Sequence, residues 1–233
     1  MPVFQLTSDL IFPAAHLASE EGVLAVGGDL SSERLLLAYC NGIFPWYIEG
    51  EPIMWWSPDP RLVLYPEQLH VSKSMKQVLR NNRFQITFDT DFKSVIGHCA
   101  EVSRKDQTSQ DGWITDDMMH AYTRLFHMGF AHSVEVREKG QLVGGLYGVA
   151  IGACFFGESM FSTQSNASKA GFITLVGELQ KRDFQMIDCQ VTTDHLVSLG
   201  AEEITRDQFL QEIKGAVSKA ENVGSWSEWL NSK

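Results

Sequence analysis

The sequence lacks the cysteine and histidine patterns that mark disulfide-rich and zinc-binding proteins. Its four cysteines lie at positions 40, 99, 154 and 189 and form no CxxC pair. Its seven histidines form no HxxxH pair. We therefore expect reduced thiols, a cytoplasmic location and no metal site.

Basic residues and long apolar runs are also scarce. Lys and Arg total 19 against 29 Asp and Glu, which gives a net charge of -10 and excludes a surface that is basic all over. No Lys or Arg precedes the first apolar residues, so the N-terminus does not read as a signal peptide. The uncharged stretch 141–157 has 17 residues, five of them glycine, and is too short and too glycine-rich for a membrane-spanning helix. We expect a monomer that acts away from membranes.

The order of the expected elements indicates the α+β class. Residues 1–62 are rich in loops and aromatic side chains, and five prolines lie between Pro45 and Pro66. From there on, capping residues and hydrophobic periodicity predict alternating helices and strands. Helices are expected at 31–42, 72–82, 92–102, 115–127, 166–182, 194–200 and 205–217, strands at 61–65, 84–90, 131–138, 141–152, 153–162 and 184–190, and a mobile loop at 101–111. Three antiparallel strands followed by helix, strand and helix predict a mixed sheet flanked by helices.

That order resembles the fold of the Gcn5-related N-acetyltransferases. Those enzymes hold the coenzyme A pyrophosphate with a glycine-rich loop in front of a helix, and the matching stretch here, STQSNASKAG at 162–171, lacks the glycine pattern. The departure indicates an acyl donor other than acyl-coenzyme A.

A closer resemblance is carried by seven long motifs between about Leu6 and Phe209. In chain order they are GGDLSSERLLLAYCNGIFPW, PIMWWSPDPR, GGLYGV, FGESMFS, NASK, IDCQ and DHLVSLGA. They are similar to those of the bacterial leucyl/phenylalanyl-tRNA–protein transferases. The resemblance implies an N-terminal domain, placed here at 1–62, and an acyltransferase-like catalytic domain at 63–233. It also implies transfer of Leu, Phe or Met from aminoacyl-tRNA onto the N-terminal Arg or Lys of proteins, which marks them for degradation by the N-end rule.

Three polar residues are the catalytic candidates that this resemblance implies. Asp188 and Gln190 lie two apart on a strand, so we expect both side chains on one face. A neutral amide is a poor base, so Gln190 is interpreted as an orienting group and Asp188 as the electrostatic or proton-accepting one. Glu158, an acid in an apolar strand, is assigned to the acceptor's cationic side chain. A structural hydrogen bond or ion pair is the plainer explanation of either acid.

Apolar residues from several segments are expected to hold the transferred amino acid. The positions that match the family's pocket are Trp46, Trp113, Tyr122, Leu146, Phe155, Met160, Leu175 and Ile187, with Ser162 near the ester. A cavity of rings and methionine suits a side chain unbranched at Cβ. Ordinary core packing is the alternative for any one of them.

A short basic segment stands out in the acidic chain. Residues 68–88 contain four basic residues, Lys73, Lys76, Arg80 and Arg83, and no acid. Spacings of 3, 4 and 3 place them on one helix face if the helix reaches residue 83. Such a face suits the phosphates of a tRNA acceptor stem, although a solvated helix face would look the same.

The expected reaction is attack of an amine on an aminoacyl ester. An ester is already activated, so neither ATP nor another cofactor is needed. The partners are the 3′ end of aminoacyl-tRNA and a protein with N-terminal Arg or Lys. Two other functions stay open at this point, an acyl-coenzyme A-dependent N-acyltransferase and a non-catalytic module that binds N-terminal residues.

Overall fold

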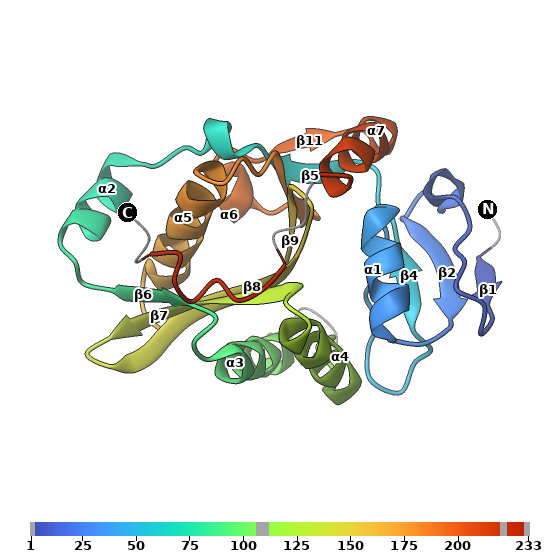
Figure 1. Cartoon of the computed structure of the whole chain (residues 1–233), viewed down its shortest axis with the longest axis horizontal. Helices are drawn as coiled ribbons and strands as arrows, with labels where there is room; N and C mark the ends of the chain where they lie inside the picture. Colours follow the sequence, from blue (N-terminus) through green and yellow to red (C-terminus); the bar gives the residue numbers. More distant parts are fainter. Residues whose placement is uncertain (1–2, 106–111, 220–222, 231–233) are drawn as a thin grey trace.

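The computed structural model describes residues 3–105, 112–219 and 223–230 and contains two sheets (Figure 1). The smaller sheet has four strands in the order β1-β2-β4-β3, and the larger has seven in the order β11-β5-β10-β9-β8-β7-β6. The smaller one occupies the N-terminal end of the molecule, beside α1. The α+β class and the mixed sheet flanked by helices are confirmed.

The N-terminal region contains more regular structure than the sequence indicates. Its elements are β1 (Phe4–Leu6), β2 (Val23–Gly27), α1 (Ser32–Cys40), β3 (Phe44–Pro45) and β4 (Met54–Trp56). The strands are two to five residues long, too short for the alternation that identifies a strand in a sequence. Neighbours distant in the chain complete the sheet, because β1 pairs parallel with β2 and β4 pairs antiparallel with both β2 and β3.

The larger sheet is formed by strands from the rest of the chain. Its strands are β5 (Arg61–Leu64), β6 (Gln85–Phe88), β7 (Ala131–Glu138), β8 (Gln141–Ile151), β9 (Cys154–Ser162), β10 (Met186–Gln190) and β11 (Glu202–Ile204). β9 and β10 are parallel, and the other neighbouring pairs are antiparallel. The division of the chain at residue 62 stays a prediction, and β5 spans it.

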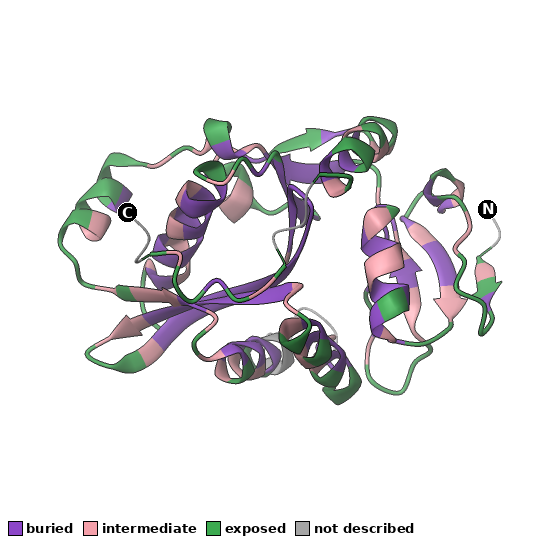
Figure 2. Cartoon of the chain, viewed as in Figure 1, coloured by how far each residue is buried: buried purple, intermediate pink, exposed green. Residues whose placement is uncertain are grey.

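Helices cover both faces of the larger sheet. They are α2 (Lys73–Arg80), α3 (Phe92–Lys105), α4 (Asp116–His127), α5 (Ala167–Gln180), α6 (Asp194–Val197) and α7 (Arg206–Val217). α3 and α4 lie on one face of β7 and β8, and α5 lies on the other (Figure 1). The central strand β8 is buried along most of its length and β9 is buried at its start, whereas α2 is largely exposed (Figure 2).

Hydroxyl caps begin the helices where the sequence predicts them. Ser31, Thr115 and Thr205 each accept a hydrogen bond from the backbone N–H three residues later. Asn166 precedes α5, but its side chain makes no capping hydrogen bond. The long helices are therefore confirmed together with most of their starting residues.

Three expectations need correction. The loop expected at 101–111 begins later, because α3 continues to Lys105, and residues 106–111 lie outside the described part of the chain. α2 ends at Arg80 rather than at residue 82, because Asn81 caps it. The strand at Glu202–Ile204 was not expected, since a three-residue edge strand carries no period in the sequence.

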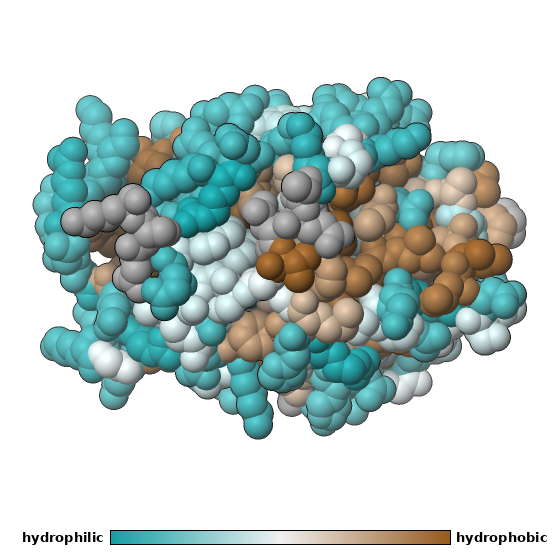
Figure 3. Space-filling view, in the orientation of Figure 1, coloured by the Kyte–Doolittle hydropathy of each residue, from teal (hydrophilic) through white to brown (hydrophobic). Residues whose placement is uncertain are grey.

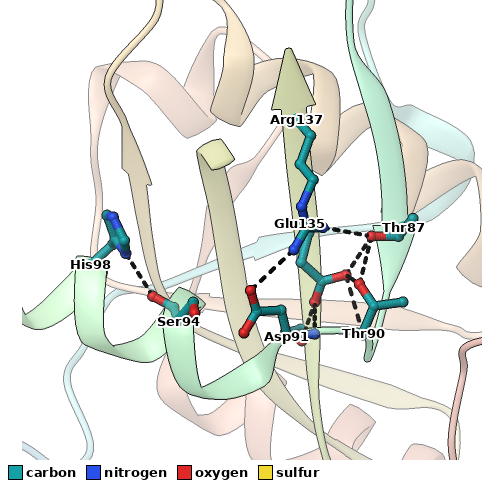
Figure 4. A network of polar contacts seen from close by, with 8 residues as sticks. Thr87, Thr90, Asp91, Ser94, His98, Glu135 and Arg137 are labelled. Atoms are coloured by element: carbon teal, nitrogen blue, oxygen red, sulfur yellow. Dashed lines mark hydrogen bonds and ion pairs between the residues drawn. The ribbon is translucent and has the colours of Figure 1, made fainter. Parts of the chain in front are cut away.

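The start of α3 is attached to the sheet through a buried carboxylate (Figure 4). Glu135 on β7 is fully buried. Its oxygens accept hydrogen bonds from the hydroxyls of Thr87 (2.6 Å), Thr90 (2.6 Å) and Ser133 (2.5 Å) and from the backbone N–H groups of Thr90 and Asp91 (3.3 Å each). An acid at the N-terminus of a helix satisfies free N–H groups and interacts favourably with the helix dipole.

Candidate functional site

A cavity of about 390 Å³ lies between the 44–46 segment and the strands β8, β9 and β10. Six of the predicted pocket residues line it, namely Trp46, Trp113, Leu146, Phe155, Met160 and Ile187. They come from both parts of the chain, because Trp46 follows β3 whereas the others belong to the larger sheet or to the segment before α4. The structure thus brings together side chains that are 141 positions apart in the sequence (46 to 187).

Three predicted pocket residues do not line this cavity. Tyr122 is fully buried on α4, and only its hydroxyl is directed to the site, through Glu158. Leu175 is fully buried in the core on the α5 side of the sheet. Ser162 is exposed at the end of β9, where its hydroxyl donates to the carbonyl oxygen of Gln164 at 2.7 Å. The resemblance to the family implies that these three residues lie near the site. None of them forms part of the cavity wall, because two are buried in the core and the third is exposed at the end of its strand.

Sequence reasoning missed other lining residues. They include Phe44, Tyr147, Phe172, Cys189, Val191, Thr193, His195 and Leu196. The segment that follows β10 contributes four of them, and no periodicity in the sequence indicates that it folds over the cavity. Of these, His195 lies in α6. Burial lowers the pKa of His195, and the nearby Lys169 charge lowers it further.

Glu158 on β9 is the carboxylate that faces the cavity. Its Oε1 accepts hydrogen bonds from the Tyr39 hydroxyl (2.7 Å) and from Nε2 of Gln190 (2.9 Å), and its Oε2 accepts from the Tyr122 hydroxyl (3.0 Å). The hydroxyls of Tyr39 and Tyr122 also contact each other. Burial raises the pKa of both tyrosines well above the usual phenol value, so they remain protonated donors at neutral pH.

The protonation of Glu158 is poised near neutrality. Burial raises its pKa to about 7, although its three hydrogen-bond donors act in the opposite direction. The three oxygen contacts within the Tyr39–Tyr122–Glu158 cluster share two phenol protons when the acid is ionised. A third proton on Glu158 completes a ring of three hydrogen bonds, so the cluster can take up a proton while all three oxygen pairs stay together. This geometry fits a group that accepts and returns a proton.

Asp188 occupies a different environment. It is fully buried, and its two oxygens accept a two-pronged ion pair from Arg61 at 2.8 and 2.7 Å. The Arg61 guanidinium also lies over the rings of Phe44 and Phe209, 4.7 and 4.5 Å from their centroids. Asp188 is not among the residues that line the cavity. Arg61 was not singled out from the sequence, although an arginine next to a buried acid is the expected partner.

Gln190 is turned into the cavity by an irregularity in β10. The pairing of β10 with β5 shifts between Asp188 and Gln190, and Gln190 has a φ of 63°. The expectation that both side chains share one face is therefore wrong, because this bulge moves Gln190 to the face of Ile187 and Cys189. The backbone N–H of Gln190 donates to Asp188 Oδ1 at 2.9 Å, which links the two residues.

The predicted basic face is only partly assembled. Lys73, Lys76 and Arg80 are exposed on α2, at an edge of the molecule that is hydrophilic in Figure 3. Arg83 lies beyond the end of the helix and pairs with Glu138 at 2.8 Å. Its charge is therefore compensated within the fold, and the helical face consists of the other three residues.

Metal and membrane sites place specific demands on side chains and helices. Within 3–105, 112–219 and 223–230, no group of three or more His, Cys, Asp or Glu side chains could hold a metal ion. No helix in the same ranges has the length and hydropathy needed to cross a bilayer.

Comparisons with known proteins give a consistent result. A family model described as leucyl/phenylalanyl-tRNA protein transferase matches residues 63–214, and one for the N-terminal domain of these proteins matches residues 28–59. A leucyl/phenylalanyl-tRNA–protein transferase of Syntrophobacter fumaroxidans is 55% identical over 226 residues, 97% of this chain and 96% of the relative. One from Pseudomonas putida strain W619 is 55% identical over 225 residues, 95% and 97% of the two chains.

The solved structures that resemble this fold are more distant. One is an aminoglycoside acetyltransferase from an uncultured soil sample, with a TM-score of 0.39, 10% identity and coverage of 62% of this chain and 95% of the other. The identity and coverage of the sequence relatives decide the assignment. The resemblance seen in the motifs is confirmed, and this chain belongs to the leucyl/phenylalanyl-tRNA–protein transferase family.

Proposed function

We propose that this protein transfers Leu or Phe, and also Met, from aminoacyl-tRNA onto the N-terminal Arg or Lys of acceptor proteins. Membership of the family supports the overall reaction, an aminoacyl-tRNA-dependent transfer to proteins. The single observation that carries the chemistry is Glu158, a partly buried carboxylate in an apolar cavity with a pKa of about 7.

The apolar part of the cavity holds the side chain of the transferred amino acid. Its wall combines the rings of Trp46, Trp113 and Phe155 with Leu146 and Met160. Burial of an apolar side chain in such a cavity is favourable roughly in proportion to the area removed from water, about 25 cal/mol per Å². Leu and Phe gain from this burial, whereas charged side chains would lose their hydration.

Glu158 takes the proton that the attacking amine must lose. The acceptor amine attacks the ester carbonyl, a C–N bond forms, and the C–O bond to the tRNA ribose breaks. One amine proton passes to the Glu158 carboxylate, and the ribose oxygen leaves with a proton returned from the same carboxyl. A general base works best when its pKa is near the working pH, and an α-amino group has a pKa of about 8. The matched pKa values support this assignment.

This proposal revises the roles assigned to the two acids from the sequence. Both oxygens of Asp188 are occupied by Arg61, so a proton would have to displace an ion pair to reach them. Gln190 keeps the orienting role. Its Nε2 donates to Glu158, which leaves the amide oxygen to accept a hydrogen bond from the acceptor amine.

The exposed bases of α2 contact the phosphates of the tRNA. Replacement of Lys76 and Arg80 by Ala is expected to weaken tRNA binding and to flatten its salt dependence by up to about 0.9 log unit for each phosphate that is no longer neutralised. Binding is measured by titration with tRNA at several salt concentrations. The control is Arg83→Gln with Glu138→Gln, which removes one charge of each sign from an existing pair. An unchanged slope for the Lys76/Arg80 variant would place the phosphate contacts elsewhere.

The decisive experiment is a transfer assay with purified protein. Radiolabelled Leu on tRNA is incubated with peptides that begin with Arg, Lys or Ala, and with an N-acetylated Arg peptide. The proposal expects label on the Arg and Lys peptides alone, since acetylation removes the nucleophile. Acetyl-coenzyme A replaces the charged tRNA in a parallel reaction. Acetylation of the peptides, or binding of the peptides without transfer of Leu, would contradict the proposed reaction.

A further inference from the structure

The buried ion pair of Arg61 and Asp188 lies next to the cavity, and neither of the two residues lines it. We propose that Arg61 is a positioning residue for the transfer reaction: through Asp188, it holds Gln190 in the backbone conformation that directs the amide onto Glu158. The inference rests on the proposed function, because it concerns the orientation of the groups that the reaction uses. It assigns a role to a side chain that sequence reasoning left aside.

Burial of this ion pair adds little net stability to the fold. Arg61 and Asp188 are both fully buried, and Nη1 of Arg61 has no hydrogen-bond partner within the described part of the chain. Removing two charges from water costs about as much as their attraction returns, and apolar residues of similar volume often stabilise a fold as well or better. Stability alone therefore does not account for an arginine with an unpartnered nitrogen in this core. A requirement for fixed geometry does.

The backbone of Gln190 departs from a regular strand. A regular strand would place residues 188 and 190 on the same face, and the amide would then lie with Arg61 instead of in the cavity. The bulge and the left-handed φ of 63° at Gln190 prevent this. Residues other than glycine and asparagine seldom adopt that conformation, so it needs support from its surroundings. The 2.9 Å hydrogen bond from the Gln190 N–H to Asp188 Oδ1 is that support.

The two contacts of the ion pair require an arginine. Nε and Nη2 of Arg61 each bind one oxygen of Asp188, so the carboxylate has a single orientation. The rings of Phe44 and Phe209, which both contact the guanidinium, further restrict its orientation. A lysine carries the same charge on one rotating ammonium group and cannot hold both oxygens in this way. Arg61→Lys therefore tests orientation while keeping the charge.

The ion pair is connected to the proton acceptor through Gln190. Gln190 Nε2 donates to Glu158 Oε1 at 2.9 Å and so stabilises the ionised carboxylate. When Gln190 loses its position, Glu158 loses a donor, and its ionisation moves to higher pH. Arg61 thus acts on the proton acceptor over two intervening residues, without contact with either substrate.

The experiment is a double-mutant cycle with Arg61→Lys, Gln190→Gly and the combined variant. Glycine adopts a positive φ without strain, so Gln190→Gly removes the amide and tolerates the bulge. We expect Arg61→Lys to lower kcat/KM about 10-fold, a size typical of residues that orient a reacting group. The same variant should move the rise of the pH–rate profile to higher pH. In the Gln190→Gly background, Arg61→Lys should change kcat/KM less than about 2-fold, because Arg61 acts through the Gln190 side chain. If the two changes were independent, their effects would multiply and the effect of about 10-fold would persist.

Several outcomes would overturn the proposal. One is a 10-fold effect of Arg61→Lys that persists without the Gln190 side chain, because Arg61 would then act by another route. Another is an unchanged pH profile. If Arg61→Lys does not fold by circular dichroism, Asp188→Asn takes its place in the cycle. Failure of both variants to fold would show that the pair is structural, and would also overturn the positioning role.

A readout without substrate separates this inference from the proposed function. The dependence of thermal unfolding on pH reports the ionisation of Glu158 in the wild type and in Arg61→Lys. A shift between the two supports the positioning role even if no Leu is transferred. Equal profiles contradict it even if the wild type is an active transferase. Absence of transfer by the wild type itself contradicts only the proposed function.

Discussion

Two acids on the larger sheet, Glu135 on β7 and Glu158 on β9, bury carboxylates in opposite ways. Glu135 is sealed in the fold and accepts from three hydroxyls and two backbone N–H groups (Figure 4). Glu158 lines a cavity and accepts from two hydroxyls and one side-chain amide. The number and kind of donors therefore differ, although both residues are acids in apolar strands.

The difference is informative because hydroxyls and backbone N–H groups respond differently to a proton. A hydroxyl can rotate and become an acceptor, whereas a backbone N–H can only donate. Two of the donors around Glu135 thus cannot reverse, whereas the two phenol hydroxyls around Glu158 can, which suits a group that changes its protonation state. A buried acid in a sequence does not reveal which of these it is. The identity of its donors does.

The largest effect is expected for Glu158→Gln. The amide keeps the shape of the side chain and can still accept at one position and donate to a tyrosine oxygen at the other, so the fold should persist. Loss of the proton acceptor should lower kcat at least about 100-fold with a smaller change in KM. The rise of the wild-type rate through about pH 7, where the Glu158 carboxylate forms, should disappear from the pH–rate profile.

Steady-state transfer kinetics across the neutral range of pH measure this prediction. If Glu158→Gln retained kcat and lost only the preference for Arg and Lys peptides, Glu158 would bind the acceptor side chain, as the sequence first suggested. The comparison of the two acids would then need a different explanation.

The matched change Glu135→Gln should act on stability and spare the reaction. Each oxygen of Glu135 accepts from one backbone N–H group, so the new NH₂ must face one of them. Such a buried donor without an acceptor costs about 1–3 kcal/mol. In a chain of this size that corresponds to roughly 2–12 °C in Tm.

Differential scanning calorimetry and the transfer assay together measure the effect of Glu135→Gln. The folded variant should keep its kcat within about 2-fold of the wild type, since Glu135 lies outside the cavity. A large fall in kcat at unchanged stability would mean that Glu135 also serves the reaction, and the contrast would fail.

A smaller effect is expected for Tyr39→Phe. The change removes the 2.7 Å hydrogen bond to Glu158, and a hydrogen bond to a charged acceptor favours the ionised form. The pKa of Glu158 should therefore rise, and the limb of the pH–rate profile should move to higher pH by about half a unit to one unit. The rate at neutral pH should fall several-fold, and the rate at high pH should change less.

Tyr65→Phe is the matched control for this variant. It also removes a hydrogen bond from a tyrosine to a glutamate, at 2.6 Å, but the partner is Glu212 on α7, away from the cavity. Its pH profile should coincide with that of the wild type. A limb that moves to lower pH in Tyr39→Phe would contradict the role of Tyr39 as a donor to the carboxylate.

The sequence predicts the long helices and strands of the fold better than it predicts the site. The helices capped by Ser31, Thr115 and Thr205 and the long strands β7, β8 and β9 follow from local signals. The bulge at Gln190 does not, because it depends on a carboxylate held by a residue 127 positions away in the chain. Residue types reveal that a polar group is buried, but its partner is set by packing between distant segments.

The smallest effect expected from the difference between Glu135 and Glu158 is a change of the protein's stability with pH. The pKa of Glu158 is about 7 in the folded protein against a usual value of 4.5, so the folded state holds one more proton than the unfolded state between these pH values. Its stability contribution is therefore fully present below about pH 4.5 and is lost as the pH rises through about 7, at no more than about 1.4 kcal/mol per pH unit. Glu158→Gln has no such proton and escapes this decline. The Tm of the wild type relative to Glu158→Gln should fall by a few degrees between about pH 5 and about pH 8. Calorimetry of the two proteins in parallel measures the difference, in which ionisations elsewhere in the chain cancel. A difference in Tm that stays constant over this range would mean that the cavity leaves the ionisation of Glu158 unaltered, and the distinction between the two acids would rest on hydrogen-bond geometry alone.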